Sequence, residues 1–380
     1  MVAYSLVTVS LPFRFQELGL SVVQYGTVLA VYALGMLATE SLWGALAFRI
    51  GRPGVLLGLG AALTLVILGI GGARTFLEFV AVFGLLGILF IFPIPLSRWL
   101  SLTARGPGTA GAGTGRYGLF FGIGLVAGTS VGPLVFVEVG FVPLVLASLA
   151  LSAVATTLFA LVPWRDVPIP VHDRGVRRQA REVLRRHFVL CAGLVAVYFV
   201  AYCLTINFLQ YYSVSLFGGT PSAAGYAIGA ARTVTLTAGF LLGPVIDRWS
   251  PARSAPLGFL GMAAGALVTF FATNYSGMVA ATLLFSAGSG CLSASLLPLA
   301  LGPIPRPAQG TAVGIFGSFE DLGLLLGPIL IGEFYATYGP RSIFPLDAGI
   351  AGFGGVMAVL IPKWLGAAGK PSIPSLPKHA

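Results

Sequence analysis

Two short stretches, GPVIDR from Gly243 to Arg248 and GALAFR from Gly44 to Arg49, each end a long apolar run and stand 199 residues apart. A second offset, of 195, relates two glycine-rich stretches at 115–133 and 310–328. The chain therefore repeats itself once along its length. The further matched residues are Gly19 with Gly218, Ser21 with Thr220 and Gly26 with Gly225 at the first offset, and Gly115, Gly122, Gly128, Gly132 and Pro133 with Gly310, Gly317, Gly323, Gly327 and Pro328 at the second.

The composition predicts a membrane protein. Hydrophobic residues make up 57% of the chain and charged residues 9%, and the mean hydropathy is +0.93. Soluble domains carry about 25% charged residues. The stretch from Gly54 to Ala73 has no charge and is long enough to cross a bilayer, which takes about 20 apolar residues.

The apolar runs predict twelve transmembrane helices, and hence an all-α membrane protein of two pseudo-symmetric six-helix bundles. We divide the chain into a first bundle at 1–164, a basic cytoplasmic linker at 165–187, a second bundle at 188–364 and a cytoplasmic tail at 365–380. The expected helices cover about 1–15, 24–48, 54–73, 78–99, 109–136, 141–163, 188–215, 222–246, 254–273, 278–302, 309–335 and 342–362.

The first predicted helix is short. Its apolar part, from Met1 to Phe13, falls below the ~20 residues that span a bilayer core. Its repeat partner begins near Phe188, and the offset places the matching residue upstream of Met1. We therefore expect this helix to be truncated and the natural chain to extend further upstream. A signal peptide is the competing interpretation, but the segment lacks a basic start and a small-residue cleavage site before Gln16.

The distribution of basic residues predicts the orientation. Of the 22 Lys and Arg residues, seventeen lie in or beside loops that would share one side of the membrane, whereas Arg14, Arg74 and Arg341 belong to the other side. By the positive-inside rule, the linker and both termini are cytoplasmic. The net charge of +10 then follows from topology in a multi-pass protein of the cell membrane, without a nucleic-acid partner.

The linker has an amphipathic pattern. Val176, Ala180, Val183 and Leu184 recur at helical spacing among arginines. This pattern favours a basic helix on the inner leaflet, in contact with the lipid bilayer. The alternative is a solvated linker whose charges only fix the topology.

Cysteine and histidine residues are few and scattered. The three cysteines, Cys191, Cys203 and Cys291, fall in predicted spans without paired spacing, and the histidines fall in the linker or the tail. A metal-dependent enzyme needs clustered ligands. The sequence also shows no nucleophile with a matching base and no phosphate-binding loop. We therefore expect no metal, no cofactor and no enzymatic activity.

A signature links the chain to a known family. Gly44, Arg49, Gly51 and Arg52 resemble the GxxxDRxGR signature of the major facilitator superfamily, and Gly243, Asp247 and Arg248 are similar to its second-half copy. The resemblance implies a cytoplasmic gate in which arginines bridge to carboxylates or helix C-termini of the other half. Phe48 occupies the position of the first-half acidic residue, and Glu40 is a candidate substitute. Alternatively, Arg49 and Arg52 only anchor the topology.

Glycines four residues apart mark helices 5 and 11. Gly124, Gly128, Gly132 and Pro133 resemble part of the antiporter signature of the same superfamily, which is an indication of efflux. The second half contains a similar pattern of glycines followed by proline, and Phe136 and Val137 replace the downstream glycine pair of the antiporter signature. We therefore interpret these glycines mainly as helix-packing and hinge residues. The repeated residues are Gly323, Gly327 and Pro328.

Five charged residues fall inside predicted spans. Such residues are costly in a membrane and usually pair or face water. In the family, helix 2 meets helix 11 and helix 5 meets helix 8, so Glu40 is expected near Glu320 or Asp321. The pattern predicts proton coupling by Asp321 and Glu320, with Arg232 as their counter-charge; a static ion-pair network is the alternative. The five residues are Glu40, Arg116, Arg232, Glu320 and Asp321.

Helices 1, 4, 7 and 10 line the central cavity in this family, and their polar positions are the candidates for substrate contacts. Hydroxyl and amide groups can bind a polar solute while aromatic faces cover its apolar part. Serines in spans also bond their own helix backbone, and tyrosines also form interfacial belts. The candidates are Tyr198, Tyr202, Asn207, Gln210 and Tyr211 on helix 7, and Ser286, Ser289 and Ser293 on helix 10.

These observations predict a secondary transporter of a small organic solute that works by alternating access as a monomer. Proton-coupled export is the leading version. Coupled uptake or facilitated diffusion through the same fold is the first alternative, and a transporter-like sensor or scaffold is the second. A sensor would carry an added soluble domain, whereas the longest predicted stretch outside the membrane is 165–187.

Overall fold

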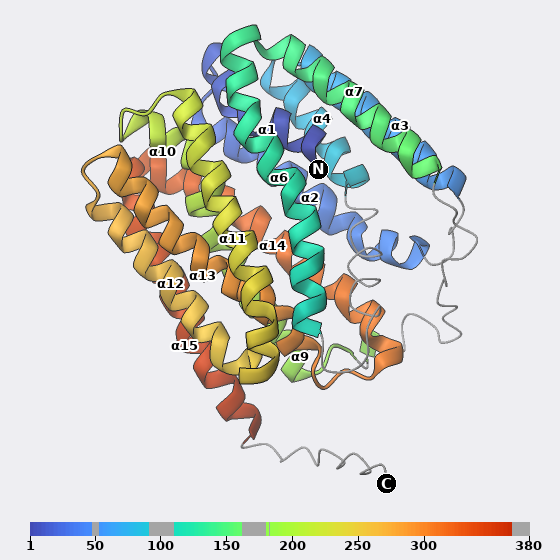
Figure 1. The fold of residues 1–380 in the computed structure, drawn as a ribbon, viewed down its shortest axis with the longest axis vertical. Helices are drawn as coiled ribbons and strands as arrows, with labels where there is room; N and C mark the ends of the chain where they lie inside the picture. The colour runs from blue at the N-terminus through green and yellow to red at the C-terminus, as the bar shows by residue number, and fades with distance from the viewer. Residues whose placement is uncertain (48–52, 91–109, 162–179, 182, 367–380) are drawn as a thin grey trace.

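The computed structural model describes residues 1–47, 53–90, 110–161, 180–181 and 183–366. Every regular element within these ranges is a helix (Figure 1). The first half contains α1 (Val2–Glu17), α2 (Val22–Ala47), α3 (Pro53–Gly72), α4 (Phe76–Phe90), α6 (Ala110–Val139) and α7 (Phe141–Ala160).

The second half begins with one interrupted span, formed by α9 (Arg186–Tyr202), the π-helix η2 (Cys203–Asn207) and α10 (Leu209–Ser215). It continues with α11 (Pro221–Trp249), α12 (Pro251–Phe271), α13 (Tyr275–Leu301), α14 (Arg306–Tyr338), the 3₁₀ turn η3 (Pro340–Ser342) and α15 (Ile343–Gly366).

The twelve predicted spans are confirmed in the part of the chain that the structure describes. Nine of them are long and apolar enough to cross a membrane by length and composition. The other three are α1, which has 16 residues, and the spans of α3 and α4, whose apolar described parts are the shorter Gly60–Gly72 and Phe76–Leu89. Residues 165–179 and 182 of the predicted linker lie outside the described ranges.

Repeat-equivalent residues have the same structural role in the two halves. Ser21 and Thr220 are the N-caps of α2 and α11: their hydroxyls accept from the backbone N–H groups of Gln24 (3.2 Å) and Ala223 (3.1 Å). Just before these caps, Gly19 and Gly218 both adopt a positive φ, of 69° and 66°. Glycine takes that conformation without steric cost. The sequence repeat therefore corresponds to the same turn, which precedes α2 in the first half and α11 in the second.

The same symmetry joins the two halves. The helix α2 packs against α14, and α11 packs against α6 (Figure 1). A Cβ on Gly26 would lie 2.9 Å from the carbonyl oxygen of Pro328, and one on Gly225 would lie 2.7 Å from the ring of Pro133. These two contacts are repeat-equivalent, since each places a glycine of one half on a proline of the other. They hold the halves together at the end where α2 and α11 begin.

Within each half, the glycine stripes let a neighbouring helix approach closely. On α6, a Cβ at Gly128 would lie 1.9 Å from Ser5 Oγ of α1, and Ser5 donates a hydrogen bond to the carbonyl of Gly124 (3.1 Å). On α14, a Cβ at Gly323 would lie 2.5 Å from the Ala196 carbonyl oxygen of α9. Small residues permit this backbone contact in membranes, where packing and polar contacts drive association.

We predict that Gly323→Ala destabilises the protein, because the added methyl group would collide with the backbone of α9. Overpacking of this kind costs about 1–3 kcal/mol. The matched control on the same helix is Gly314→Ala, whose Cβ would meet nothing within 4 Å. The control should keep or raise the melting temperature in detergent, and Gly323→Ala should lower it. Equal melting temperatures would contradict the packing role of the stripe.

Candidate functional site

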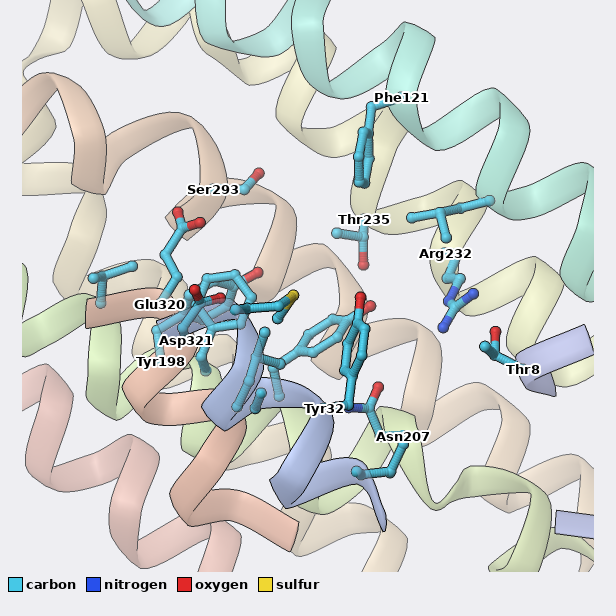
Figure 2. Close-up of a pocket in the computed structure, with 18 of the residues that line it drawn as sticks. Thr8, Tyr32, Phe121, Tyr198, Asn207, Arg232, Thr235, Ser293, Glu320 and Asp321 are labelled. Atoms are coloured by element: carbon cyan, nitrogen blue, oxygen red, sulfur yellow. The ribbon is translucent and has the colours of Figure 1, made fainter. Parts of the chain in front are cut away.

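A cavity of about 350 Å³ lies between the two halves (Figure 2). Its walls come from α1, α2 and α6 of the first half and from α9, α10, α11, α13 and α14 of the second. Its lining is mainly apolar, with a small number of polar side chains. Ligand sites in proteins have this size and composition, and in transporters built from two repeats they lie between the repeats.

Tyrosines form much of the polar lining. Tyr4 stacks on Tyr32 with ring centroids 6.0 Å apart, and Tyr198 lies 6.1 Å from Tyr202. Tyr25, about two helical turns before Tyr32 on α2, also lines the cavity. Such rings offer an apolar face and a hydroxyl that donates or accepts hydrogen bonds. The wall is therefore suited to the body of an organic molecule.

Arg232 supplies the positive charge of the site. It lies on α11 and lines the cavity, and its Nε and Nη1 atoms are buried without a hydrogen-bond partner among the described residues. The guanidinium is close enough to Tyr4, Tyr25 and Tyr202 to interact with them electrostatically, and it is within hydrogen-bonding reach of the Tyr202 hydroxyl.

The carboxyl groups gather on another side of the cavity. Figure 2 shows Glu320, Asp321, Tyr198 and Ser293 together, with Arg232 and Thr8 across the cavity from them. Asp321 is 3% exposed, and Glu320 is half-buried. Arg232 was expected to be the counter-charge of these carboxyl groups, but in this conformation it stands apart from them. The side chain of Arg116 lies outside the described part of the chain.

Glu40 reaches the cavity from α2 and is 2% exposed. A Cβ on Gly317 of α14 would lie 1.8 Å from its Oε1 atom, so the carboxyl group lies directly against the α14 backbone. Gly317 precedes Asp321 by about one helical turn, or ~5.4 Å. The structure thus brings Glu40 to the same region of α14 as Asp321.

Five of the eight predicted substrate contacts line the cavity, namely Tyr198, Tyr202, Asn207, Gln210 and Ser293. The other three are buried behind the wall. Ser289 shares a 2.8 Å hydrogen bond with the Tyr198 hydroxyl, and Tyr211 packs on Tyr25 with ring centroids 5.5 Å apart. Ser286 lies between α13 and α11, where its carbonyl accepts from Thr235 (3.2 Å). These three residues orient lining residues and do not themselves face the cavity.

The sequence prediction missed the contribution of the first half. Tyr4 and Thr8 on α1, and Tyr25, Tyr32 and Met36 on α2, all line the cavity. The prediction restricted the lining to helices 1, 4, 7 and 10, whereas the described residues of α4 stay away from the cavity and α2, α6, α11 and α14 contribute. A signal was present: positions 25, 29, 32, 36 and 40 follow a helical stripe on α2 that ends in Glu40.

A second missed carboxyl group lies at the break of the seventh span. Asp347 of α15 is fully buried, and it accepts a hydrogen bond from Thr205 in the π-helix η2, while its Oδ1 atom is buried without a partner. Single π-helical turns inside helices occur often at functional sites. Asn207 closes this turn and lines the cavity. The Thr205–Asp347 contact therefore supports the irregular backbone that positions Asn207.

The predicted gate is only partly described. Arg49, Gly51 and Arg52 lie outside the described residues, and Gly44 lies in the last turn of α2. Gly243, Asp247 and Arg248 occupy the last two turns of α11, where Asp247 is half-buried and Arg248 is exposed.

Two repeated six-helix halves around a central cavity define a membrane transporter. The sequence model of the Major Facilitator Superfamily matches residues 1–231 and 190–377. The chain therefore belongs to the Major Facilitator Superfamily, whose members are transporters and not enzymes. It is a multi-pass membrane protein of that type.

Similar proteins agree with this assignment. The multidrug resistance protein MdtG of Salmonella paratyphi A is 25% identical over 374 residues, which cover 93% of this chain and 90% of MdtG. A triacylglyceride transporter of Mycolicibacterium hassiacum is 32% identical over 110 residues, which cover 29% of this chain and only 20% of that protein. The human organic anion transporter MFSD10 and the E. coli fucose:proton symporter FucP share the fold, with TM-scores of 0.72 and 0.71 at 16% identity, and cover 94% and 95% of this chain and 95% of each of their own.

We predict that Thr205→Val lowers the melting temperature by a few degrees, because the buried Asp347 carboxyl group would lose its hydrogen-bond donor. An unsatisfied buried polar group costs about 1–3 kcal/mol. Asp347→Asn, which keeps an acceptor for Thr205 in the same shape, should melt close to the wild type. If Thr205→Val is as stable as the wild type, the Thr205–Asp347 hydrogen bond does not stabilise the π-helical turn η2.

Proposed function

We propose that this chain is a proton-coupled exporter of small organic molecules that works by alternating access as a monomer in the cell membrane, with both termini in the cytoplasm. The observation that carries the proposal is the cavity between the halves, which combines a tyrosine wall with the buried carboxyl groups of Asp321 and Glu40. A solute and a proton would thus share one cavity.

The coupling step rests on the carboxyl groups at the α2–α14 contact. Two carboxylates in one low-dielectric region repel each other, so a shared proton is favoured. Movement of α2 relative to α14 would change the surroundings of Asp321 and Glu40 and so release the proton on the other side. Glu320, on the same helix and nearer the open cavity, would pass the proton to or from water.

Export is supported by the relatives named as multidrug resistance proteins, which align along nearly the whole chain. In this account, the pair Asp247 and Arg248 at the end of α11 would close the cytoplasmic gate, together with Arg49 and Arg52. Coupled uptake and facilitated diffusion could use the same cavity, and the experiment below separates them from export.

The test uses purified protein in liposomes that contain a pH-sensitive dye. A panel of organic solutes is offered under an imposed proton gradient, and proton flux and solute accumulation are recorded together. We expect Asp321→Asn to abolish gradient-driven accumulation while solute exchange survives, because the amide keeps the shape but cannot carry a proton. Glu320→Gln should slow coupled transport, and Glu333→Gln, at an exposed position of the same helix, is the matched control.

The outcomes separate the alternatives. Solute movement without proton flux in the wild type would indicate facilitated diffusion. Solute that accumulates in the same direction as the proton flux would indicate coupled uptake. Coupled accumulation that persists in Asp321→Asn, Glu320→Gln and the double variant would rule out the carboxylate mechanism. A joint loss of thermal stability and of both transport modes would instead indicate a bracing ion network.

A further inference from the structure

The positive side of the cavity has unused hydrogen-bonding capacity. The Nε and Nη1 atoms of Arg232 are buried without a hydrogen-bond partner among the described residues. The only ion pair formed between two described residues is the surface pair Arg14–Glu17 (2.9 Å). A positive charge in the middle of a transmembrane helix is costly unless an anion or water compensates for it. Among the described residues, Arg232 therefore has no anionic partner.

The surroundings of Arg232 indicate what that partner is. The hydroxyl groups of Tyr4, Tyr25 and Tyr202 lie within its electrostatic reach, and Thr8 is beside it in Figure 2. The tyrosine hydroxyl groups can donate to an anion together with the guanidinium, whereas the Thr8 hydroxyl donates to the carbonyl of Tyr4 in its own helix (3.0 Å). The carboxyl groups of Glu320 and Asp321 are across the cavity, so they do not compete for this place. The convergence of a guanidinium and several hydroxyl groups favours an anionic group over a cationic one.

The geometry of the guanidinium indicates which kind of anionic group it binds. Its planar fork matches the two oxygens of a carboxylate and forms charge-assisted hydrogen bonds with them. The tyrosine and phenylalanine rings that surround the cavity would cover an apolar or aromatic body, and a volume of about 350 Å³ admits a molecule of two or three rings.

We propose that Arg232 binds the carboxylate of an aromatic organic anion, which is the substrate class of this transporter. The inference rests on the proposed function, because it takes the cavity as the transport site. The substrate's carboxylate neutralises Arg232 on one side of the cavity while Asp321 and Glu320 remain available for the proton on the other. Charge selection and proton coupling are thus carried by different residues.

The experiment compares three ligands of similar size with purified protein at pH 7: 2-naphthoate, the neutral and isosteric 2-naphthamide, and the cationic 2-naphthylmethylamine. Binding is measured by calorimetry. We expect the wild type to bind 2-naphthoate roughly tenfold or more tightly than the amide, because the amide loses the charge-assisted hydrogen bonds. The amine should bind more weakly than both.

Three variants locate the effect. Arg232→Met should bind 2-naphthoate no better than 2-naphthamide while it still binds the amide, which shows that the cavity remains intact. Arg232→Lys should keep part of the preference, because it keeps the charge but not the planar fork. Arg253→Met, at an exposed position of α12, is the matched control and should bind like the wild type.

Several results would overturn the inference. Equal or tighter binding of the amide or the amine by the wild type would do so, as would an absence of measurable 2-naphthoate binding. A preference for 2-naphthoate that persists in Arg232→Met would place the anion site elsewhere. The proposed function is judged separately: solute-driven proton flux in liposomes can succeed when anion selection fails, and selective binding in Asp321→Asn would show that the two properties have different origins.

Discussion

The whole architecture depends on the absence of a side chain at a small number of glycines. Gly26 rests on Pro328 and Gly225 rests on Pro133, so the two halves touch at two symmetry-related places where a methyl group would collide. In a bilayer, where burial of apolar surface gives little drive for helices to associate, such close approach is a main source of helix association. The same helices form walls of the central cavity, and they bring the charged residues of α2, α11 and α14 to it.

The separation of charge within the cavity follows from this arrangement. Because α11 faces α6 and α14 faces α2, Arg232 and the pair Glu320 and Asp321 come to the cavity from different sides. Tyrosines of both halves line the same cavity. A site with a fixed positive side and an acidic side can hold an anion and a proton at the same time. This division is the reason why the proposed substrate charge is assigned to Arg232 and the proton to the carboxyl groups.

Much of the fold could be predicted from the sequence, because hydropathy and an internal repeat report directly on spans and symmetry. Ser21 and Thr220 were recognised as equivalents, and both prove to be helix caps. The lining residues were harder to predict. Tyr25 and Tyr32 carry no charge and resemble core residues in the sequence. Their helical stripe toward Glu40 marks one face of α2, and the structure shows that this face lines the cavity. Asp347 lies in a predicted span but accepts a hydrogen bond from Thr205, 142 residues away, which no local pattern indicates.

In the proposed alternating access, the two halves separate at the Gly26–Pro328 and Gly225–Pro133 contacts when the cavity opens on that side. The most direct test is the distance between spin labels at Val139, at the end of α6, and Tyr226, at the start of α11, in a background without native cysteines. Both positions are exposed and belong to different halves near the second contact. Alternating access predicts a short distance, as in this structure, and a second, longer distance whose population changes with pH and with solute. A single distance under all conditions, in protein that transports, would contradict it.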